Sequence, residues 1–376
     1  MEIFHLKEFD TVSPTLAETL RLCMLRAGLS NADNATPYIM GNPKAWLGTA
    51  YHAVLEGSRS LGAENFEVQV QSLWVQAIQK EYDRSRLHQW DKRFGPPESW
   101  PGYYVTASLA VIRAMELTKK ETSRETVRAQ NSTNKIEFIE RNFAGSNGRI
   151  VGRPDVVSRD EVVDFKSGEI FEERGEKEIK KSYIRQLRIY AFLVRETLGW
   201  WPMRGVLLPM GGARIEVDLK PNECLKEAED AIRLLEEYNN SIVKGRDPVV
   251  LASPSSTNCR WCPFQLYCPA FWNSIDPNWA NDLSSGSIRG RANEKASPIH
   301  NALAFSLSIH VDRGTITANQ HISLFPLDPL VHPDVAQVQA GDLLHVTGLF
   351  ARADDSLIAT KRTMIVLDEH IPRIEI

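Results

Sequence analysis

The sequence lacks any uninterrupted apolar run of the ~18–20 residues that a membrane-spanning helix needs, so an ordinary helical membrane protein is excluded. Its first residues, MEIFHLKEFD, do not show the basic-then-apolar order of a signal peptide. The net charge is only −4, so there is no strong basic field with which to coat nucleic acid. Internal repeats are also missing. We therefore expect a globular, cytoplasmic protein without membrane contact.

Cysteine is scarce, with five in 376 residues, and an odd number in a reducing compartment argues against a disulfide framework. Three of the five, Cys259, Cys262 and Cys268, form the pattern C-x2-C-x5-C. Such clustering in an intracellular chain indicates a metal site, which needs a fourth ligand to close. Cys224 stands alone on an amphipathic segment and is interpreted as an ordinary buried thiol.

The length allows two or three domains. Apolar residues recur at helical spacing through the first third of the chain, which predicts helices over 13–28, 46–61, 67–84 and 104–121. Short segments rich in β-branched and aromatic residues then predict strands over 135–143, 148–157, 161–168, 205–210 and 214–219. Helices are expected between and after these strands, over 181–199 and 224–243. Strands flanked by helices indicate an α/β core.

The C-terminal part of the sequence changes character. Residues 282–299 are polar, aperiodic and rich in Gly and Ser, so we predict a linker there, between one domain over 1–281 and another over 300–376. Beyond it, AFSLSIHV alternates apolar and polar residues as a strand does, and further strands are expected with a turn at Asp354 and Asp355. About 75 residues of short strands predict a small all-β domain, an OB-like barrel.

The segment PDVVSRDEVVDFKSG carries the sharpest chemical pattern. In a strand, Asp164 and Lys166 face the same side. If the hairpin is symmetric about residues 159–160, Asp155 lies opposite Asp164, with Cβ atoms ~4.5–5.5 Å apart. Two carboxylates this close favour a hard divalent ion between them, and Lys166 would then lie beside the attacking water and a phosphodiester. The same pattern also occurs by chance on solvated hairpins.

Two flanking segments add polar residues to this pattern. LGTAYHAVLE places His52 on a predicted helix, and RQLRIYAF places Gln186 and Tyr190 four residues apart, on one helical face. Each of these residues taken alone is typical of core packing.

The order GTAYH, GRPD, VVDFK and QLRIY resembles the RecB-type branch of the PD-(D/E)xK nucleases, which includes bacterial recombination nuclease domains and CRISPR adaptation nucleases. The resemblance covers roughly residues 13–270 and implies a mixed central sheet flanked by helices. It implies a site that uses Mg²⁺ or Mn²⁺, with Lys166 as the catalytic lysine and Gln186 and Tyr190 contacting nucleic acid or supporting the site. The implied metal ligands are His52, Asp155, Asp164 and the carbonyl of Phe165, with a further acidic residue at Glu137 or Glu140.

The segment around Cys23, SPTLAETLRLCMLRAGL, resembles the N-terminal cysteine segment of the iron–sulfur subset of this family, although Met24 stands where a proline is often found. The resemblance implies a 4Fe–4S cluster that joins the two ends of the nuclease domain through Cys23, Cys259, Cys262 and Cys268. Two alternatives remain: a four-cysteine zinc site, and a three-cysteine cluster with Cys23 merely buried in a helix.

The resulting hypothesis is a metal-dependent DNA nuclease that acts on single-stranded DNA or DNA ends in recombination, CRISPR adaptation or phage defence. No helicase motif is present, so any unwinding would come from a partner helicase. The alternative is a catalytically silent DNA-end-binding or scaffold protein, which the complete set of Asp155, Asp164 and Lys166 argues against. Several aromatic residues could stack on bases or simply pack: Tyr82, Trp90, Trp100, Tyr103 and Tyr104.

Overall fold

The computed structural model describes residues 2–39, 41–62, 64–86, 91–128, 136–139, 141–172, 178–283, 285–299, 301, 303–351 and 357–376. The α-helices in these ranges are α1 (Pro14–Leu22), α2 (Met24–Asn31), α3 (Pro43–Ser58), α4 (Phe66–Ser85), α5 (Tyr103–Arg128), α6 (Lys181–Leu198), α7 (Pro221–Val243), α8 (Ser256–Cys259) and α9 (Pro269–Ser274). The strands are β1 (Ile3–His5), β2 (Ile136–Ile139), β3 (Phe143–Gly145), β4 (Ile150–Gly152), β5 (Val156–Ser158), β6 (Glu161–Lys166), β7 (Arg204–Pro209), β8 (Ile215–Asp218), β9 (Gly286–Ala292), β10 (Ser297–Ile299), β11 (Ala304–Gly314), β12 (His321–Leu327), β13 (Leu343–Ala351), β14 (Leu357–Ile358), β15 (Met364–Leu367) and β16 (Arg373–Glu375).

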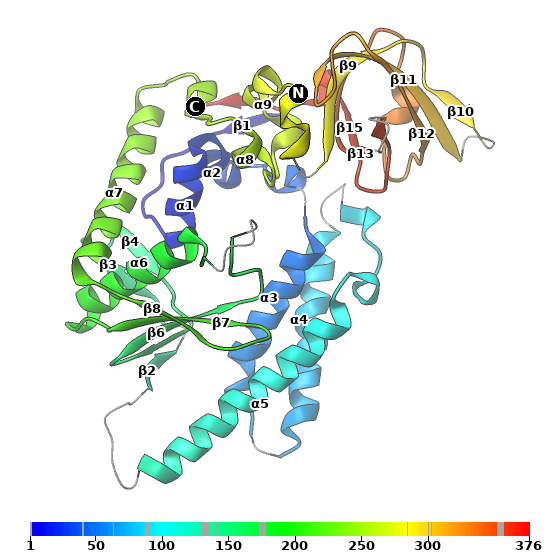
Figure 1. Cartoon of the computed structure of the whole chain (residues 1–376). Helices are drawn as coiled ribbons and strands as arrows, with labels where there is room; N and C mark the ends of the chain where they lie inside the picture. Colours follow the sequence, from blue (N-terminus) through cyan, green and yellow to red (C-terminus); the bar gives the residue numbers. More distant parts are fainter. Residues whose placement is uncertain are drawn as a thin grey trace.

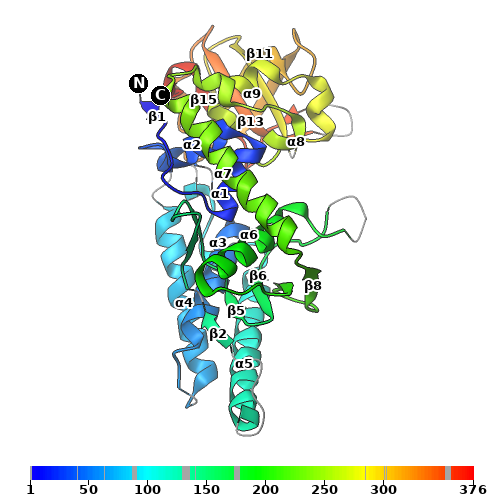
Figure 2. The same ribbon diagram turned by 90° about the vertical axis from the view of Figure 1, so that its left-hand side faces the viewer.

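A five-stranded sheet in the order β2-β5-β6-β7-β8 forms the centre of the larger part of the molecule. Strands β6 and β7 run parallel, whereas the other neighbouring strands run antiparallel. One hydrophobic core packs α1, α2, α6 and α7 against one face, and a second packs α3, α4 and α5 against the other (Figures 1 and 2). The predicted α/β fold with a mixed central sheet is therefore confirmed.

The β5–β6 hairpin has the register that the sequence predicts. Val156 pairs with Val163 and Val157 with Val162, so one step further along the ladder Asp155 stands opposite Asp164. The side chains alternate between the two cores: Val162 belongs to the core on the α6 side, and Phe165 to the core on the α3 side. This alternation directs Asp164 and Lys166 toward α6.

The predicted helix over 13–28 is two helices, which meet at Cys23. This residue has extended backbone angles, φ −166° and ψ 112°, and ends α1 as well as beginning α2. Leu20 and Leu25 are buried on the two sides of the break. Because the apolar spacing continues across one extended residue, periodicity alone could not reveal it.

The predicted linker over 282–299 is wrong, because most of it forms strands. β9 lies between β11 and β13 in the C-terminal antiparallel sheet, with Ser287 and Ile288 fully buried. The glycines that suggested flexibility serve close packing instead: a Cβ at Gly290 would lie 2.2 Å from the backbone oxygen of His310. The alternation predicted beyond residue 300 is confirmed, since Leu307 and Ile309 are buried. The predicted turn at residues 354–355 lies outside the described ranges.

The C-terminal sheet is joined closely to the larger part of the molecule. β16 pairs in parallel with β1, so the first and last strands of the chain lie side by side (Figure 1). The ring of Trp272, which follows the cysteine-rich segment, packs edge-on against His345 of β13, with centroids 4.9 Å apart. The side chain of Arg93 donates a 3.2 Å hydrogen bond to the backbone oxygen of Arg362.

Candidate active site and cysteine pocket

Asp155 and Asp164 meet at the open end of the β5–β6 hairpin. The Asp155 carboxylate accepts a 2.5 Å hydrogen bond from the backbone N–H of Phe165, which fixes it against the neighbouring strand. Asp164 is buried, with 5% of its surface exposed. Its Oδ1 accepts a hydrogen bond from the Gln186 amide, and its Oδ2 forms an ion pair with the ammonium of Lys166. The hairpin thus holds two carboxylates and an amine in one small region.

Helix α6 supplies a row of polar groups above these strands. Gln186 accepts a 2.6 Å hydrogen bond from Lys166 Nζ and donates to Asp164 Oδ1 at 3.2 Å and to the Tyr190 hydroxyl at 3.0 Å. Residues four apart lie on one helical face, so Tyr190 supports Gln186 from the next turn. Burial raises the pKa of Tyr190, and Asp164 adds to this effect, so its hydroxyl stays protonated. The structure therefore places both predicted α6 residues around Asp164 and Lys166.

Sequence analysis missed Tyr183, one turn before Gln186. The ammonium of Lys166 lies over the Tyr183 ring, 4.3 Å from its centroid, in cation–π geometry. Burial raises the pKa of Tyr183, and the nearby carboxylates of Asp164 and Glu169 raise it further. The signal in the sequence is its position three residues before Gln186, which puts both side chains on the same helical face.

His52 reaches the site from α3. Its Nδ1 lies 3.9 Å from Asp155 Oδ1. Burial lowers the pKa of His52, so the imidazole is neutral near pH 7 and offers a nitrogen lone pair. The approach of α3 depends on Gly48, because a Cβ there would lie 2.5 Å from the hydroxyl of Ser167, just beyond β6.

The chemistry of these side chains fits a hard divalent cation such as Mg²⁺ or Mn²⁺. Asp155 and Asp164 offer carboxylate oxygens and His52 a neutral nitrogen, although Asp164 Oδ2 is already paired with the Lys166 ammonium. As they stand, no three His, Cys, Asp or Glu side chains in the described ranges are arranged to enclose a metal ion. The predicted ligand set thus remains a prediction, and the residues that carry it lie together.

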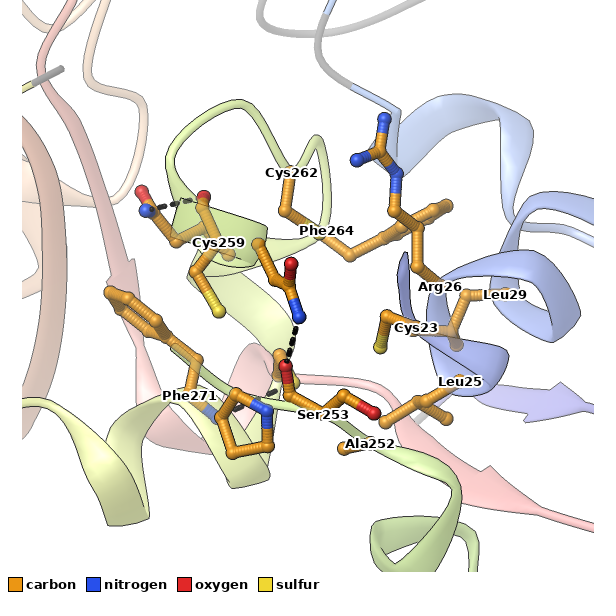
Figure 3. A pocket seen from close by; sticks show the side chains of 14 residues that line it. Cys23, Leu25, Arg26, Leu29, Ala252, Ser253, Cys259, Cys262, Phe264 and Phe271 are labelled. Atoms are coloured by element: carbon orange, nitrogen blue, oxygen red, sulfur yellow. Dashed lines mark hydrogen bonds between the residues drawn. The ribbon is translucent and has the colours of Figure 1, made fainter. Parts of the chain in front are cut away.

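Four of the five cysteines line one pocket. Cys23 enters it from the junction of α1 and α2, and Cys259 from the opposite wall (Figure 3). Burial raises the pKa of Cys262 to about 11 and that of Cys268 to about 12, and in both cases the nearby thiols of Cys23 and Cys259 raise it further. Residues more than 230 positions apart in the sequence are therefore brought together here.

As arranged here, the cysteines of the described residues do not enclose a metal ion, so the predicted cluster remains a prediction. Thiols whose pKa is raised, such as those of Cys262 and Cys268, stay protonated near neutral pH, and a bound metal centre would favour their thiolate form. Burial raises the pKa of both Cys259 and Cys262, and the charge of Arg26, which also lines the pocket, opposes part of that rise. Cys224 lies elsewhere, fully buried in α7, where burial raises its pKa to about 12.

The remaining predicted site residues are partly buried in the core, partly exposed and partly outside the described ranges. The Phe165 side chain packs in the core on the α3 side. Glu140 and Trp90 lie outside the described residues, and only the backbone of Glu137 is described. Of the aromatic residues proposed for base stacking, Trp100 is buried, whereas Tyr104 is 68% exposed. Tyr82 and Tyr103 are half-buried, so Tyr104 is the most exposed of the four described rings.

One of the comparisons with known proteins identifies a family. A sequence model of the PD-(D/E)XK nuclease superfamily matches residues 11–269. Among solved structures, the chain is similar to SSO0001 at 16% identity, over 71% of this chain and 89% of that chain, with a TM-score of 0.27. No curated protein sequence matches. None of the helices in the described ranges has the length and apolar character of a membrane span.

Proposed function

The chain belongs to the PD-(D/E)XK nuclease superfamily, whose members are typically metal-dependent nucleases, and on that premise we propose that it hydrolyses phosphodiester bonds of single-stranded DNA or DNA ends. The observation that carries this proposal is the convergence of Asp155, Asp164 and Lys166 at the open end of the hairpin, where Gln186 contacts Asp164 and Lys166. The biological settings that we propose are recombination, CRISPR adaptation or phage defence, with an OB-like C-terminal domain assisting the binding of DNA or of a partner such as a helicase.

Each residue has a defined part in the proposed reaction. Asp155, Asp164 and His52, with the Phe165 carbonyl, would hold Mg²⁺ or Mn²⁺, which would supply Lewis-acid charge at the phosphate. Lys166 brings an ammonium to the same place, where it orients water and offsets negative charge on the phosphate. Gln186 holds Lys166 and Asp164 at a fixed separation, and Tyr190 holds Gln186.

The nuclease proposal is tested by cleavage of end-labelled single- and double-stranded DNA with Mn²⁺, Mg²⁺ or EDTA. We expect Asp164→Ala and Lys166→Ala to lower cleavage at least ~100-fold while DNA binding is retained. Asp160→Ala is the matched control, because this carboxylate lies in the turn at the other end of the same hairpin. Undiminished cleavage in both site variants would refute the assignment. DNA binding by the wild-type protein without cleavage would favour the scaffold alternative.

We further propose that Cys23, Cys259, Cys262 and Cys268 hold a 4Fe–4S cluster. The cluster proposal is supported by the shared pocket, in which Cys23 from the N-terminal helices lies with the three cysteines of the C-x2-C-x5-C loop. Protein purified without oxygen should be brown and contain iron and sulfide. Cys23→Ser should lose both, whereas Cys224→Ser should retain them. A colourless protein with one zinc would instead favour the four-cysteine zinc site.

A further inference from the structure

Helix α5 carries a largely buried guanidinium, that of Arg113, with 12% of its side chain exposed. Its Nη2 donates a 3.0 Å hydrogen bond to the backbone oxygen of Pro209, and its Nη1 donates a 2.8 Å bond to Glu116, three residues further along the same helix. The neighbouring Ala110 and Ala114 are fully buried in the core that α5 shares with α3. A planar guanidinium suits two acceptors in different directions, and here it joins α5 to the central sheet.

The contact with Pro209 fixes the end of β7 that lies beside Lys166. In the parallel ladder of β6 and β7, Lys166 is the partner of Pro209. The next residue, Met210, donates a 2.8 Å hydrogen bond to the backbone oxygen of Lys166. Arg113 therefore holds the short segment that supports the backbone of Lys166. Movement of this segment would displace the Lys166 ammonium from its partners on α6.

The same guanidinium lies near the part of α3 that carries His52. Tyr51, the residue before His52, is fully buried, and its ring packs edge-on against the imidazole with centroids 5.8 Å apart. Burial raises the pKa of Tyr51 to about 12; the charge of Arg113 opposes that rise, and the carboxylate of Asp155 adds to it. Both charged groups are therefore near the Tyr51 hydroxyl, which brings α5 close to the contact of His52 with Asp155.

We propose that Arg113 is a positioning residue for the proposed nuclease reaction, and that it holds Lys166 through β7 and His52 through Tyr51. This role rests on the proposed function and deepens it, because it makes helix α5 a support of the candidate active site. Without the guanidinium, the carbonyl of Pro209 loses this donor and α5 is no longer tied to the end of β7. Arg113 acts through these neighbours rather than by contact with a phosphate.

The first measurement uses the metal-free protein, with its lysines labelled with ¹³C at Cε. Because the Lys166 ammonium lies over the Tyr183 ring, its ring-current shift reports its position. We expect this shift to decrease in Arg113→Met, which keeps an apolar side chain of similar length, and to persist in Arg233→Met. Arg233 is the matched control, because it forms ion pairs with two acidic residues of its own helix, α7.

The second measurement is steady-state cleavage of a labelled oligonucleotide in saturating Mn²⁺, together with Mn²⁺ binding followed by electron paramagnetic resonance. Arg113→Met should lower kcat at least ~10-fold with little change in KM for DNA, because a small displacement of a catalytic group is costly. It should also weaken Mn²⁺ binding ~3-fold, since Tyr51 supports His52. Arg113→Lys, which keeps a donor for Pro209, should recover kcat to within about 3-fold of wild type.

Normal kcat together with an unchanged Lys166 shift in Arg113→Met would overturn the proposal, as would a loss confined to KM. Equal losses in Arg113→Met and Arg233→Met would do the same. If thermal unfolding shows that Arg113→Met does not fold, Arg113→Gln replaces it, with the same expected direction and the same refuting result. A wild-type protein that binds Mn²⁺ but cleaves no DNA would refute the nuclease proposal alone, because the Lys166 shift and the Mn²⁺ affinity would still test the role of Arg113.

Discussion

Replacing Tyr183 by leucine would remove the aromatic face that lies 4.3 Å from the Lys166 ammonium. The remaining partners of that ammonium are Asp164 and Gln186. A divalent ion held by the carboxylates would compete with Lys166 for Asp164, and Lys166 would then depend mainly on Gln186 and on the ring of Tyr183. Loss of the ring should therefore reduce catalysis more than it reduces the stability of the resting protein.

The size of the effect follows from the environment of the pair. A cation–π contact is worth about 0.5–1 kcal/mol when exposed and about 2 kcal/mol when desolvated. Lys166 is largely buried, with 12% of its side chain exposed, and Tyr183 is half-buried, which places the contact at about 1–2 kcal/mol. If this positions Lys166 in the transition state, kcat should fall about 5–30-fold in Tyr183→Leu. KM for DNA should change little.

Tyr183→Phe is the matched control, because it keeps the ring and removes only the hydroxyl. Steady-state cleavage of a labelled oligonucleotide in saturating Mn²⁺ gives kcat and KM for both variants, and a thermal unfolding scan checks the fold. Selective labelling of lysine with ¹³C at Cε adds a readout without substrate: the ring-current shift at Lys166 should vanish in Tyr183→Leu and persist in Tyr183→Phe. Equal damage in both variants would assign the role to the hydroxyl, and normal kinetics in Tyr183→Leu would refute the reasoning.

Three further predictions concern packing and pH. Gly48→Ala should reduce cleavage by pushing α3 away from β6, and the double variant with Ser167→Gly should restore it, since the added Cβ meets the Ser167 side chain. Gly290→Ala should lower the free energy of unfolding by about 2–4 kcal/mol, measured in a denaturant titration, because its Cβ would meet the rigid backbone at His310. Burial lowers the pKa of His345 to about 4. Between about pH 6.5 and pH 4 this imidazole is therefore protonated in the unfolded chain but not in the folded protein. The free energy of unfolding should fall as the pH drops through this range. His345→Gln should weaken that pH dependence in thermal unfolding measured from pH 7 to pH 4.

The parts of the fold that depend on local periodicity could be predicted from the sequence. The hairpin register follows from a side-chain period of two and a two-residue turn, so the facing of Asp155 and Asp164 could be stated in advance. Tyr183 was missed for a different reason. Its partner Lys166 lies 17 residues away on another element, and nothing in the local pattern separates a tyrosine that packs from one that carries a cation.

The prediction of a linker over residues 282–299 was wrong because a composition rich in Gly and Ser does not indicate flexibility where strands pack closely. Gly290 belongs to a buried strand, and only the neighbouring backbone at His310 shows why no side chain fits there. The meeting of Cys23 with Cys259 was expected from the family resemblance, because the spacing of the cysteines alone does not show how α2 packs against the C-terminal loops. In this protein, tertiary packing decides the features that sequence reasoning missed.

The pairing of β1 with β16 has a consequence for how the molecule is made. Phe4, at the centre of β1, is fully buried in the core that supports α6, and its partner Ile374 packs against the same core. During synthesis, residues 373–375 leave the ribosome long after Phe4, so β1 cannot pair with β16 until the last residues have been made. A chain that stalls short of these residues would expose an unpaired strand edge, which makes it a target for chaperones and proteases.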